Sequence, residues 1–223
     1  MDAWAILFDR AIDCLDTIPH TGSPMPDWTF GGGTALMLRY AHRNSHDIDI
    51  FLPDPQWLSL LSPRFNDAID AWVSDYQEGP TWLKLAMPMG EIDFIVALDL
   101  TTSPSIPTTI HGRPVKIESP AEIIAKKLRH RGGSLRPRDI LDIAVVQSRD
   151  PGSLWASRRA WVQELPAIRR RLDALATQYP VQSNTLDLLP AGEPYRQTAW
   201  TVVNAFIARV HAAERYHDSD LER

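Results

Sequence analysis

The sequence predicts an α/β fold, with a small mixed β-sheet flanked by helices and followed by a C-terminal bundle of helices. First, strand-like residues 28–30 lead into three consecutive glycines, an apolar segment and the alternating stretch 47–51. Second, further alternating stretches, typical of strands, lie between residues 81 and 117. Third, most of the chain after residue 119 has helical periodicity. Because no glycine- or serine-rich linker separates residues 1–118 from residues 119–223, we expect these two regions to share one core.

Composition is that of an ordinary globular protein and excludes several classes. The 223 residues are 44% hydrophobic and 23% charged, which fits one large domain or two small ones. The net charge of −5 argues against a strongly basic, non-specific nucleic-acid binder. The single cysteine, Cys14, excludes an internal disulfide and fits a buried thiol in a reducing compartment. No signal-peptide pattern or membrane-length apolar run is present, so we expect a cytoplasmic protein without membrane contact.

The remaining elements follow from periodicity and from start and stop signals. Helices are expected over residues 4–15, 34–41 and 65–73, strands over 81–87 and 91–98, and a hairpin over 108–117. Ser119-Pro120-Ala121-Glu122 predicts a capping box at the start of a helix that ends near residue 130. Later helices are expected from residue 138, and over residues 154–165, 168–176 and 193–215.

The stretch from Phe30 to Phe51 carries the strongest chemical signal. Three glycines, Gly31–Gly33, let the backbone turn sharply, and amides at the start of the following helix can face an anion. In the stretch that follows, the period of two sends Asp47 and Asp49 to one face of a strand. Their mutual repulsion calls for a cation, and Mg²⁺ typically binds one or two carboxylates together with water and substrate phosphates. The stretch therefore predicts a metal-bound nucleotide.

Two groups of residues in this stretch resemble the signature of the AbiEii/AbiGii-type nucleotidyltransferases. They are Gly32-Gly33-Thr34-Ala35-Leu36 and His42-Arg43-x-Ser45-x-Asp47-Ile48-Asp49-Ile50-Phe51. Such proteins are toxin components of bacterial toxin–antitoxin and phage-defence systems, within the DNA polymerase β-like nucleotidyltransferase superfamily. Lys127-Leu128, followed about ten residues later by Arg138-Asp139-x-x-Asp142, is similar to the second block of the same family. The resemblance covers about residues 30–146.

The resemblance implies a role for each residue of the first block. Asp47 and Asp49 would hold Mg²⁺, with Mn²⁺ as the alternative ion. A third carboxylate from a neighbouring strand would bind metal and take the proton from the attacking hydroxyl; Asp93 lies in an apolar run, whereas the alternative, Glu91, lies closer to a turn.

Glycines Gly32 and Gly33 would bind the nucleotide, and the hydroxyl of Thr34 would either meet a terminal phosphate or cap the helix. Arg43 either contacts phosphate or pairs with one of the two aspartates. The neighbouring histidines, His42 and His46, are expected to be hydrogen-bonded surface residues rather than ligands.

The second block has both a structural and a functional interpretation. Lys127 lies in an apolar stripe of a helix. On the structural interpretation its stem packs at the edge of the core. On the functional interpretation, which the resemblance implies, its ammonium neutralises the triphosphate. Spacing alone predicts an i,i+4 ion pair between Arg138 and Asp142. The resemblance places Arg138, Asp139 and Asp142 at or beside the nucleotide.

These observations lead to the hypothesis of Mg²⁺-dependent transfer of a nucleoside monophosphate from an NTP to an acceptor hydroxyl. The acceptor would be RNA, tRNA or protein, and an antitoxin encoded nearby would be the partner. An antibiotic nucleotidyltransferase and a non-catalytic nucleotide-binding module stay open as alternatives. The arginines at 158–159 and 169–171 form either solvated faces or contacts to nucleic acid or an acidic partner.

Overall fold

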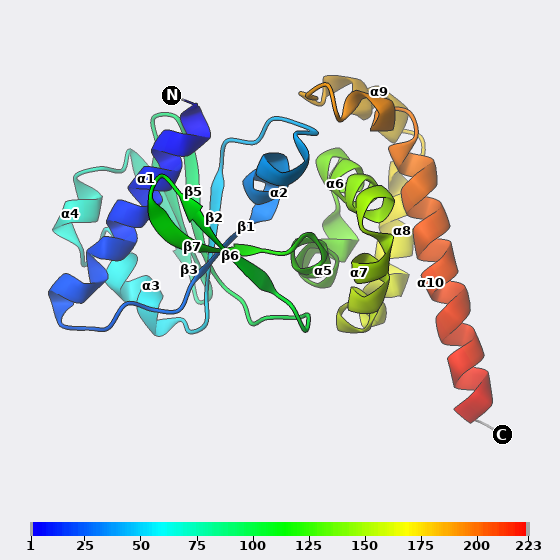
Figure 1. Cartoon of the computed structure of the whole chain (residues 1–223), viewed down its shortest axis with the longest axis horizontal. Coiled ribbons are helices and arrows are strands. Elements are labelled where there is room, and N and C mark those ends of the chain that lie inside the picture. The colour runs from blue at the N-terminus through cyan, green and yellow to red at the C-terminus, as the bar shows by residue number, and fades with distance from the viewer. Residues whose placement is uncertain (1, 222–223) are drawn as a thin grey trace. The chain divides into compact units, whose positions relative to one another are not determined.

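The chain is described by a computed structural model over residues 2–221, with side chains described up to residue 215 (Figure 1). It consists of two compact units. The sheet unit comprises Met1–Arg39, Ser45–Asp99 and Ser105–Ser119. The helical unit comprises Pro120–Arg223 together with two short segments, Tyr40–Asn44 and Leu100–Pro104.

Across residues 2–221, the sheet unit contains a seven-stranded mixed sheet with the order β3-β4-β5-β2-β1-β7-β6. The strands are β1 Thr29–Gly31, β2 Ile48–Leu52, β3 Asp75–Gly79, β4 Trp82–Met87, β5 Gly90–Val96, β6 Ser105–Ile110 and β7 Arg113–Glu118. β2 is parallel to β5 and β1 is parallel to β7, whereas the other neighbours are antiparallel. This arrangement confirms the expected α/β fold.

The core of the sheet unit follows from the alternation in β2 and β5. Ile48 and Ile50 are fully buried, and so are Ile92 and Phe94 of β5, while the residues between them are half-buried. The helices of this unit are α1 Ala3–Asp16, α2 Gly32–Tyr40, α3 Gln56–Leu61 and α4 Asp67–Asp70. α1 packs against β2 and β5, and its Cys14 is a buried free thiol, as expected. The opposite face of β2 and β5 is therefore free to carry polar residues.

In the sheet unit, one predicted helix is wrong and one strand was not predicted. Only Asp67–Asp70 of the predicted helix 65–73 is helical, because Asn66 caps it by accepting from the Ile69 amide at 3.2 Å, and Phe65 is 69% exposed. Strand β3 was not predicted. It is an edge strand with polar residues on both faces, so it lacks the alternation that identifies a half-buried strand.

The helical unit is built from α5 Pro120–Arg131, α6 Pro137–Arg149, α7 Pro151–Ala156, α8 Leu165–Leu175, α9 Tyr179–Gln182 and α10 Ala199–Leu221. α6 packs against α5 and α10 (Figure 1). The start of α5 at Pro120 was predicted, and α6 begins at Pro137, one residue before the predicted start at residue 138. The predicted helix 154–165 is wrong, since α7 ends at Ala156 and 3₁₀ turns follow. No helix between residues 2 and 221 is long and apolar enough to cross a membrane.

Candidate active site

Two half-buried carboxylates are neighbours on the face of the sheet opposite to the buried isoleucines of β2. Asp49 of β2 and Asp93 of β5 are direct partners in the parallel ladder, so their side chains project to the same face. Gly31 of β1 is the partner of Asp49 on the other side, and Lys84 of β4 is the partner of Asp93. A row of four positions thus crosses β4, β5, β2 and β1, with the two aspartates at its centre.

Gly32 brings the backbone up against this row. Its φ angle is +70°, in the left-handed region that favours glycine, and a Cβ atom at this position would overlap the Asp49 carboxylate. Gly32 and Gly33 begin α2, so the first amides of this helix lie beside Asp49. The start of a helix favours negative charge, including phosphate. Sequence reasoning expected the glycines to admit a ligand, and the structure shows that they also admit a carboxylate.

Asp47 lies just before β2 and is held in a different way. Its backbone carbonyl accepts the Thr34 hydroxyl at 2.6 Å, and its Oδ1 accepts from the Glu91 amide at 3.3 Å. Thr34 is fully buried in the third position of α2, so its predicted role as an N-cap is wrong. A contact between Thr34 and phosphate stays a prediction. The hydroxyl instead fixes the backbone that leads into β2.

Electrostatic coupling is strong along the row. Burial, and then the charge of Asp49, raise the pKa of Asp93 to about 6, whereas Lys84 acts in the opposite direction. Burial alone would lower the pKa of Lys84, but a hydrogen bond to Glu91 and the charge of Asp93 outweigh it and raise that pKa. Sequence reasoning missed Lys84, although its position as the one charge in an apolar strand was a usable signal.

The row has carboxylate donors for a divalent cation. Among residues 2–221, no group of three histidine, cysteine, aspartate or glutamate side chains is arranged to hold a metal ion. Asp49 and Asp93 nevertheless supply two carboxylates on neighbouring strands, and Mg²⁺ typically uses one or two together with substrate phosphates. This pair fits such an ion, and Asp47 as a third ligand stays a prediction.

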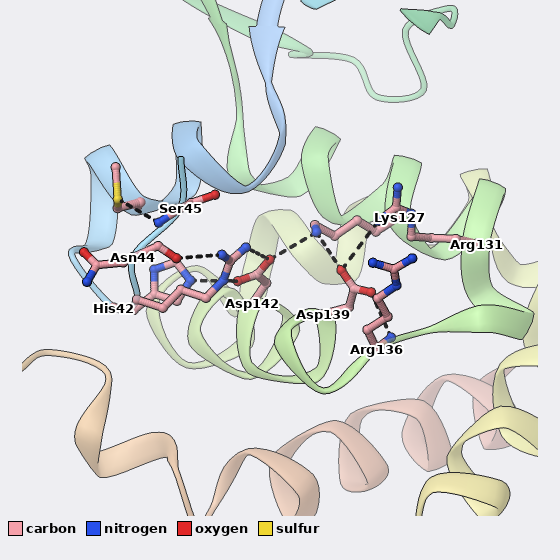
Figure 2. A network of polar contacts seen from close by, with 10 residues as sticks. His42, Asn44, Ser45, Lys127, Arg131, Arg136, Asp139 and Asp142 are labelled. Atoms are coloured by element: carbon pink, nitrogen blue, oxygen red, sulfur yellow. Dashed lines mark hydrogen bonds and ion pairs between the residues drawn. The ribbon is translucent and has the colours of Figure 1, made fainter. Parts of the chain in front are cut away.

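The helical unit holds a second cluster of polar side chains (Figure 2). Asp142 lies at its centre: its Oδ1 is 2.7 Å from Nε of Arg43 and 2.8 Å from Nε2 of His42. Its Oδ2 is 2.9 Å from Nη2 of Arg43 and 3.1 Å from Nζ of Lys127. Lys127 also donates to Oδ1 of Asp139 at 2.8 Å, and the Arg136 amide donates to the other oxygen of Asp139. We call these five side chains, His42, Arg43, Lys127, Asp139 and Asp142, the buried network.

The charges of the buried network compensate each other away from water. Burial alone would raise the pKa of Asp142, but Arg43 and Lys127 hold it well below its ordinary value. Burial would likewise raise the pKa of Asp139, but Lys127 outweighs it and that pKa is also lowered. Two cations and two anions, all buried, form a neutral arrangement that suits a structural role.

Several predicted nucleotide-binding residues therefore have partners that the sequence did not indicate. Arg43 was expected to contact phosphate or pair with an aspartate of the acidic strand, and it pairs with Asp142 instead. His42 was expected on the surface, yet it is fully buried. The predicted pair of Arg138 with Asp142 is wrong, because Asp142 is taken by other partners. A contact of any of these residues with nucleotide stays a prediction.

Buried carboxylates fasten both short segments of the helical unit. Asp142 holds the segment Tyr40–Asn44 through His42 and Arg43. Glu122, fully buried in α5, accepts from the amides of Leu100 and Thr101 at 2.9 Å each. The glutamate that the sequence assigned to a capping box thus also anchors the segment that follows the strands of the acidic row.

Known proteins resemble this chain in structure, and one protein family resembles it in sequence. No curated protein matches its sequence. The solution structure of the antibiotic-resistance factor ANT(2'')-Ia is similar over 76% of this chain and 97% of its own, with 16% identity and a TM-score of 0.49. A nucleotidyltransferase-like protein from Paracoccidioides brasiliensis covers 81% of this chain and 88% of its own, with 16% identity and a TM-score of 0.34.

The CD-NTase CdnG of Bradyrhizobium diazoefficiens, solved with GTP, covers 94% of this chain and 87% of its own, with 14% identity and a TM-score of 0.40. All three TM-scores lie under 0.5, so these likenesses carry no further argument. Stronger information comes from the sequence. A family model described as nucleotidyl transferase AbiEii toxin, type IV TA system, matches residues 21–210.

Proposed function

Because this chain belongs to the AbiEii family of nucleotidyltransferase toxins, we propose that it transfers a nucleoside monophosphate from an NTP to an acceptor hydroxyl, using a divalent metal held by Asp49 and Asp93. The family match covers most of the chain and makes it a nucleotidyltransferase. We infer the identity of the metal, the residues that bind the substrate and the cellular role. These inferences rest on Asp49 and Asp93 of the sheet unit and on the start of α2.

The observation that carries the proposal is the direct opposition of Asp49 and Asp93 beside the start of α2. Two carboxylates on one face attract a divalent ion, and the amides at the start of α2 attract an anion. A nucleoside triphosphate with its metal carries both charges. The sheet unit therefore offers complementary groups for the two parts of such a substrate.

The reaction follows from these groups. The acceptor oxygen forms a bond to the α-phosphorus, the bond to the bridging β-phosphate oxygen breaks, and pyrophosphate leaves. Asp93 takes the proton of the acceptor hydroxyl. A divalent ion, when bound by Asp49 and Asp93, would neutralise charge on the phosphates. The amides of α2 orient the triphosphate.

Charge is distributed unevenly between the two units. The sheet unit holds 6 of the 23 lysines and arginines and 16 of the 28 acidic residues, a formal charge of −10. The helical unit holds the other 17 lysines and arginines and the other 12 acidic residues, a formal charge of +5. A basic unit suits a polyanionic acceptor, so we favour RNA, including tRNA, over protein as the acceptor.

The acidic sheet unit favours a second candidate acceptor. The formal charge of −10 on the sheet unit would attract a cationic small molecule, as an antibiotic nucleotidyltransferase requires. The two acceptors are distinguished by incubating the protein with labelled NTP and either total bacterial RNA or an aminoglycoside. Label in the RNA supports our choice, and label only in the aminoglycoside replaces it.

A toxin role predicts growth arrest in a host that lacks the antitoxin. Expression of the wild-type chain alone should slow growth, and expression of the Asp49→Ala form at the same level should not. Equal growth of both strains, in the native host with the neighbouring antitoxin gene deleted, would count against a toxin.

Pyrophosphate release tests the proposal directly. Wild-type protein supplied with NTP, Mg²⁺ and bacterial extract should release pyrophosphate, and EDTA should stop the release. Asp49→Asn should abolish it, whereas Asp70→Asn, a change at an exposed position of the same unit, should leave it unchanged. NTP binding without any pyrophosphate release would instead indicate a non-catalytic nucleotide-binding module.

A further inference from the structure

The sheet unit contains a lysine that the proposed reaction does not use. Lys84 lies in β4 between the buried residues Leu83 and Leu85, and its side chain is 30% exposed. In the sheet it stands opposite Asp93, which stands opposite Asp49. We call Lys84, Asp93 and Asp49 the charge row.

Two carboxylates share the ammonium group of Lys84. Its Nζ lies 2.6 Å from Oε2 of Glu91 and 3.3 Å from Oδ1 of Asp93. Glu91 and Asp93 are alternate residues of β5, so they project from the same face. The ammonium therefore has a close partner outside the charge row and a more distant partner within it.

We propose that Lys84 is a positioning residue that supplies the positive charge beside Asp93 while no metal is bound. When a metal binds Asp93, Lys84 loses its contact with that carboxylate and keeps its hydrogen bond to Glu91. This inference rests on the proposed function, because it takes Asp49 and Asp93 as the metal-binding pair. Like charges on directly opposed residues destabilise a sheet. The ammonium offsets that repulsion in the metal-free protein.

The same ammonium weakens the binding of the metal. A divalent cation bound by Asp93 is repelled by a positive charge that lies 3.3 Å from the same carboxylate. Lys84 thereby keeps the two carboxylates together before the metal arrives and makes the metal easier to release. A purely structural lysine would have no such effect on metal affinity.

Metal binding by the protein without nucleotide tests the proposal, with Mn²⁺ as the probe and free Mn²⁺ measured by electron paramagnetic resonance. Lys84→Met should bind Mn²⁺ about three- to tenfold more tightly than wild type, the range expected for loss of one partly solvated charge. Lys84→Arg keeps the charge and should bind as wild type does. Lys116→Met removes an exposed, paired lysine elsewhere in the sheet unit and should also leave the affinity unchanged.

Thermal melting gives a second readout that separates positioning from simple packing. In EDTA, Lys84→Met should melt at a lower temperature than wild type. Saturating Mn²⁺ should reduce the difference to the part that comes from the lost hydrogen bond to Glu91. Adding Asp93→Asn should reduce it in the same way, since the repulsion then no longer exists. A packing role would instead lower the melting temperature equally with and without metal.

The outcomes separate this inference from the proposed function. If wild type binds Mn²⁺ and Asp49→Asn does not, the proposed metal-binding pair is supported. Unchanged or weaker binding of Mn²⁺ by Lys84→Met would then overturn only the role of Lys84. Absence of Mn²⁺ binding by wild type overturns the proposed function and the role of Lys84 with it. If Lys84→Met does not fold, Lys84→Gln takes its place with the same expected results.

Discussion

Replacing Asp93 by asparagine should stabilise the metal-free protein. The pKa of Asp93 is raised from its ordinary 3.8 to about 6, so the folded state binds a proton more tightly than the unfolded state does. At about 1.4 kcal/mol per pKa unit, the ionised carboxylate costs the folded protein about 3 kcal/mol above pH 6. That cost already includes the favourable charge of Lys84, which lowers the pKa of Asp93. The Asp93→Asn change should therefore stabilise the protein by up to about 3 kcal/mol at pH 8.

The sign of the pH dependence is a further check. Because the folded pKa is the higher one, the stability of wild type falls as pH rises from about 4 to about 6 and is then constant. The cost at pH 5 is therefore roughly half of its value at pH 8. The advantage of Asp93→Asn should shrink accordingly.

Urea unfolding in EDTA at pH 8 and pH 5 measures both effects, with Asp70→Asn as the control for loss of a surface charge. Saturating Mg²⁺ should remove the advantage of Asp93→Asn, since only wild type then gains from metal binding. An Asp93→Asn protein less stable than wild type at pH 8 in EDTA would refute the reasoning. So would a gain that is the same at both pH values.

Three further predictions concern other buried groups. Lys127→Met should lower the free energy of unfolding by about 3 kcal/mol, because it removes a cation partner from two buried carboxylates. Lys116→Met, at an exposed ion pair, should change it by less than about 1 kcal/mol. Urea unfolding measures both changes. Gly32→Ala should destabilise more than Gly112→Ala in thermal melting. Both glycines have a positive φ, but only at Gly32 would the new Cβ overlap a carboxylate. Burial raises the pKa of Cys14 to about 12, so a thiol reagent should label it only when the protein unfolds; rapid labelling at pH 8 would contradict its burial.

Local patterns in the sequence were sufficient for the central strand of the site. The period of two in residues 47–51 predicted that Ile48 and Ile50 would be buried and that Asp49 would lie on the other face, and the structure has this arrangement. The run of apolar residues around Asp93 likewise placed it in a strand, where it stands opposite Asp49. Alternation reports which face of a strand a residue occupies. The expectation that the strands of Asp49 and Asp93 are neighbours came from the resemblance, and the parallel ladder confirms it.

Long-range partners could not be predicted in the same way. Arg43 and Asp142 are 99 residues apart, and nothing local to either residue indicates the other. The sequence therefore left Arg43 between phosphate and the nearby aspartates, and it treated Lys127 as either snorkelling or facing phosphate. In the structure both cations share one buried carboxylate. Pairing of this kind depends on how the helices pack, which periodicity does not specify.

The domain division and the nucleotide contacts of the second block stay predictions. The sequence divided the chain at residues 118 and 119, whereas the structure assigns Tyr40–Asn44 and Leu100–Pro104 to the helical unit as well. These segments contain few apolar residues that could mark their unit. Their attachment depends on the buried carboxylates Asp142 and Glu122, and so on tertiary contacts.

Transfer of the α-phosphate is the measurement that tests the central claim most directly. Wild-type protein should transfer label from NTP labelled at the α-phosphate to RNA in the presence of Mg²⁺, and should transfer none from NTP labelled at the γ-phosphate. Asp49→Asn and Asp93→Asn should each abolish the transfer while remaining folded, and Asp70→Asn should behave as wild type. Undiminished transfer by Asp49→Asn or Asp93→Asn would contradict the assignment of this carboxylate pair as the catalytic site.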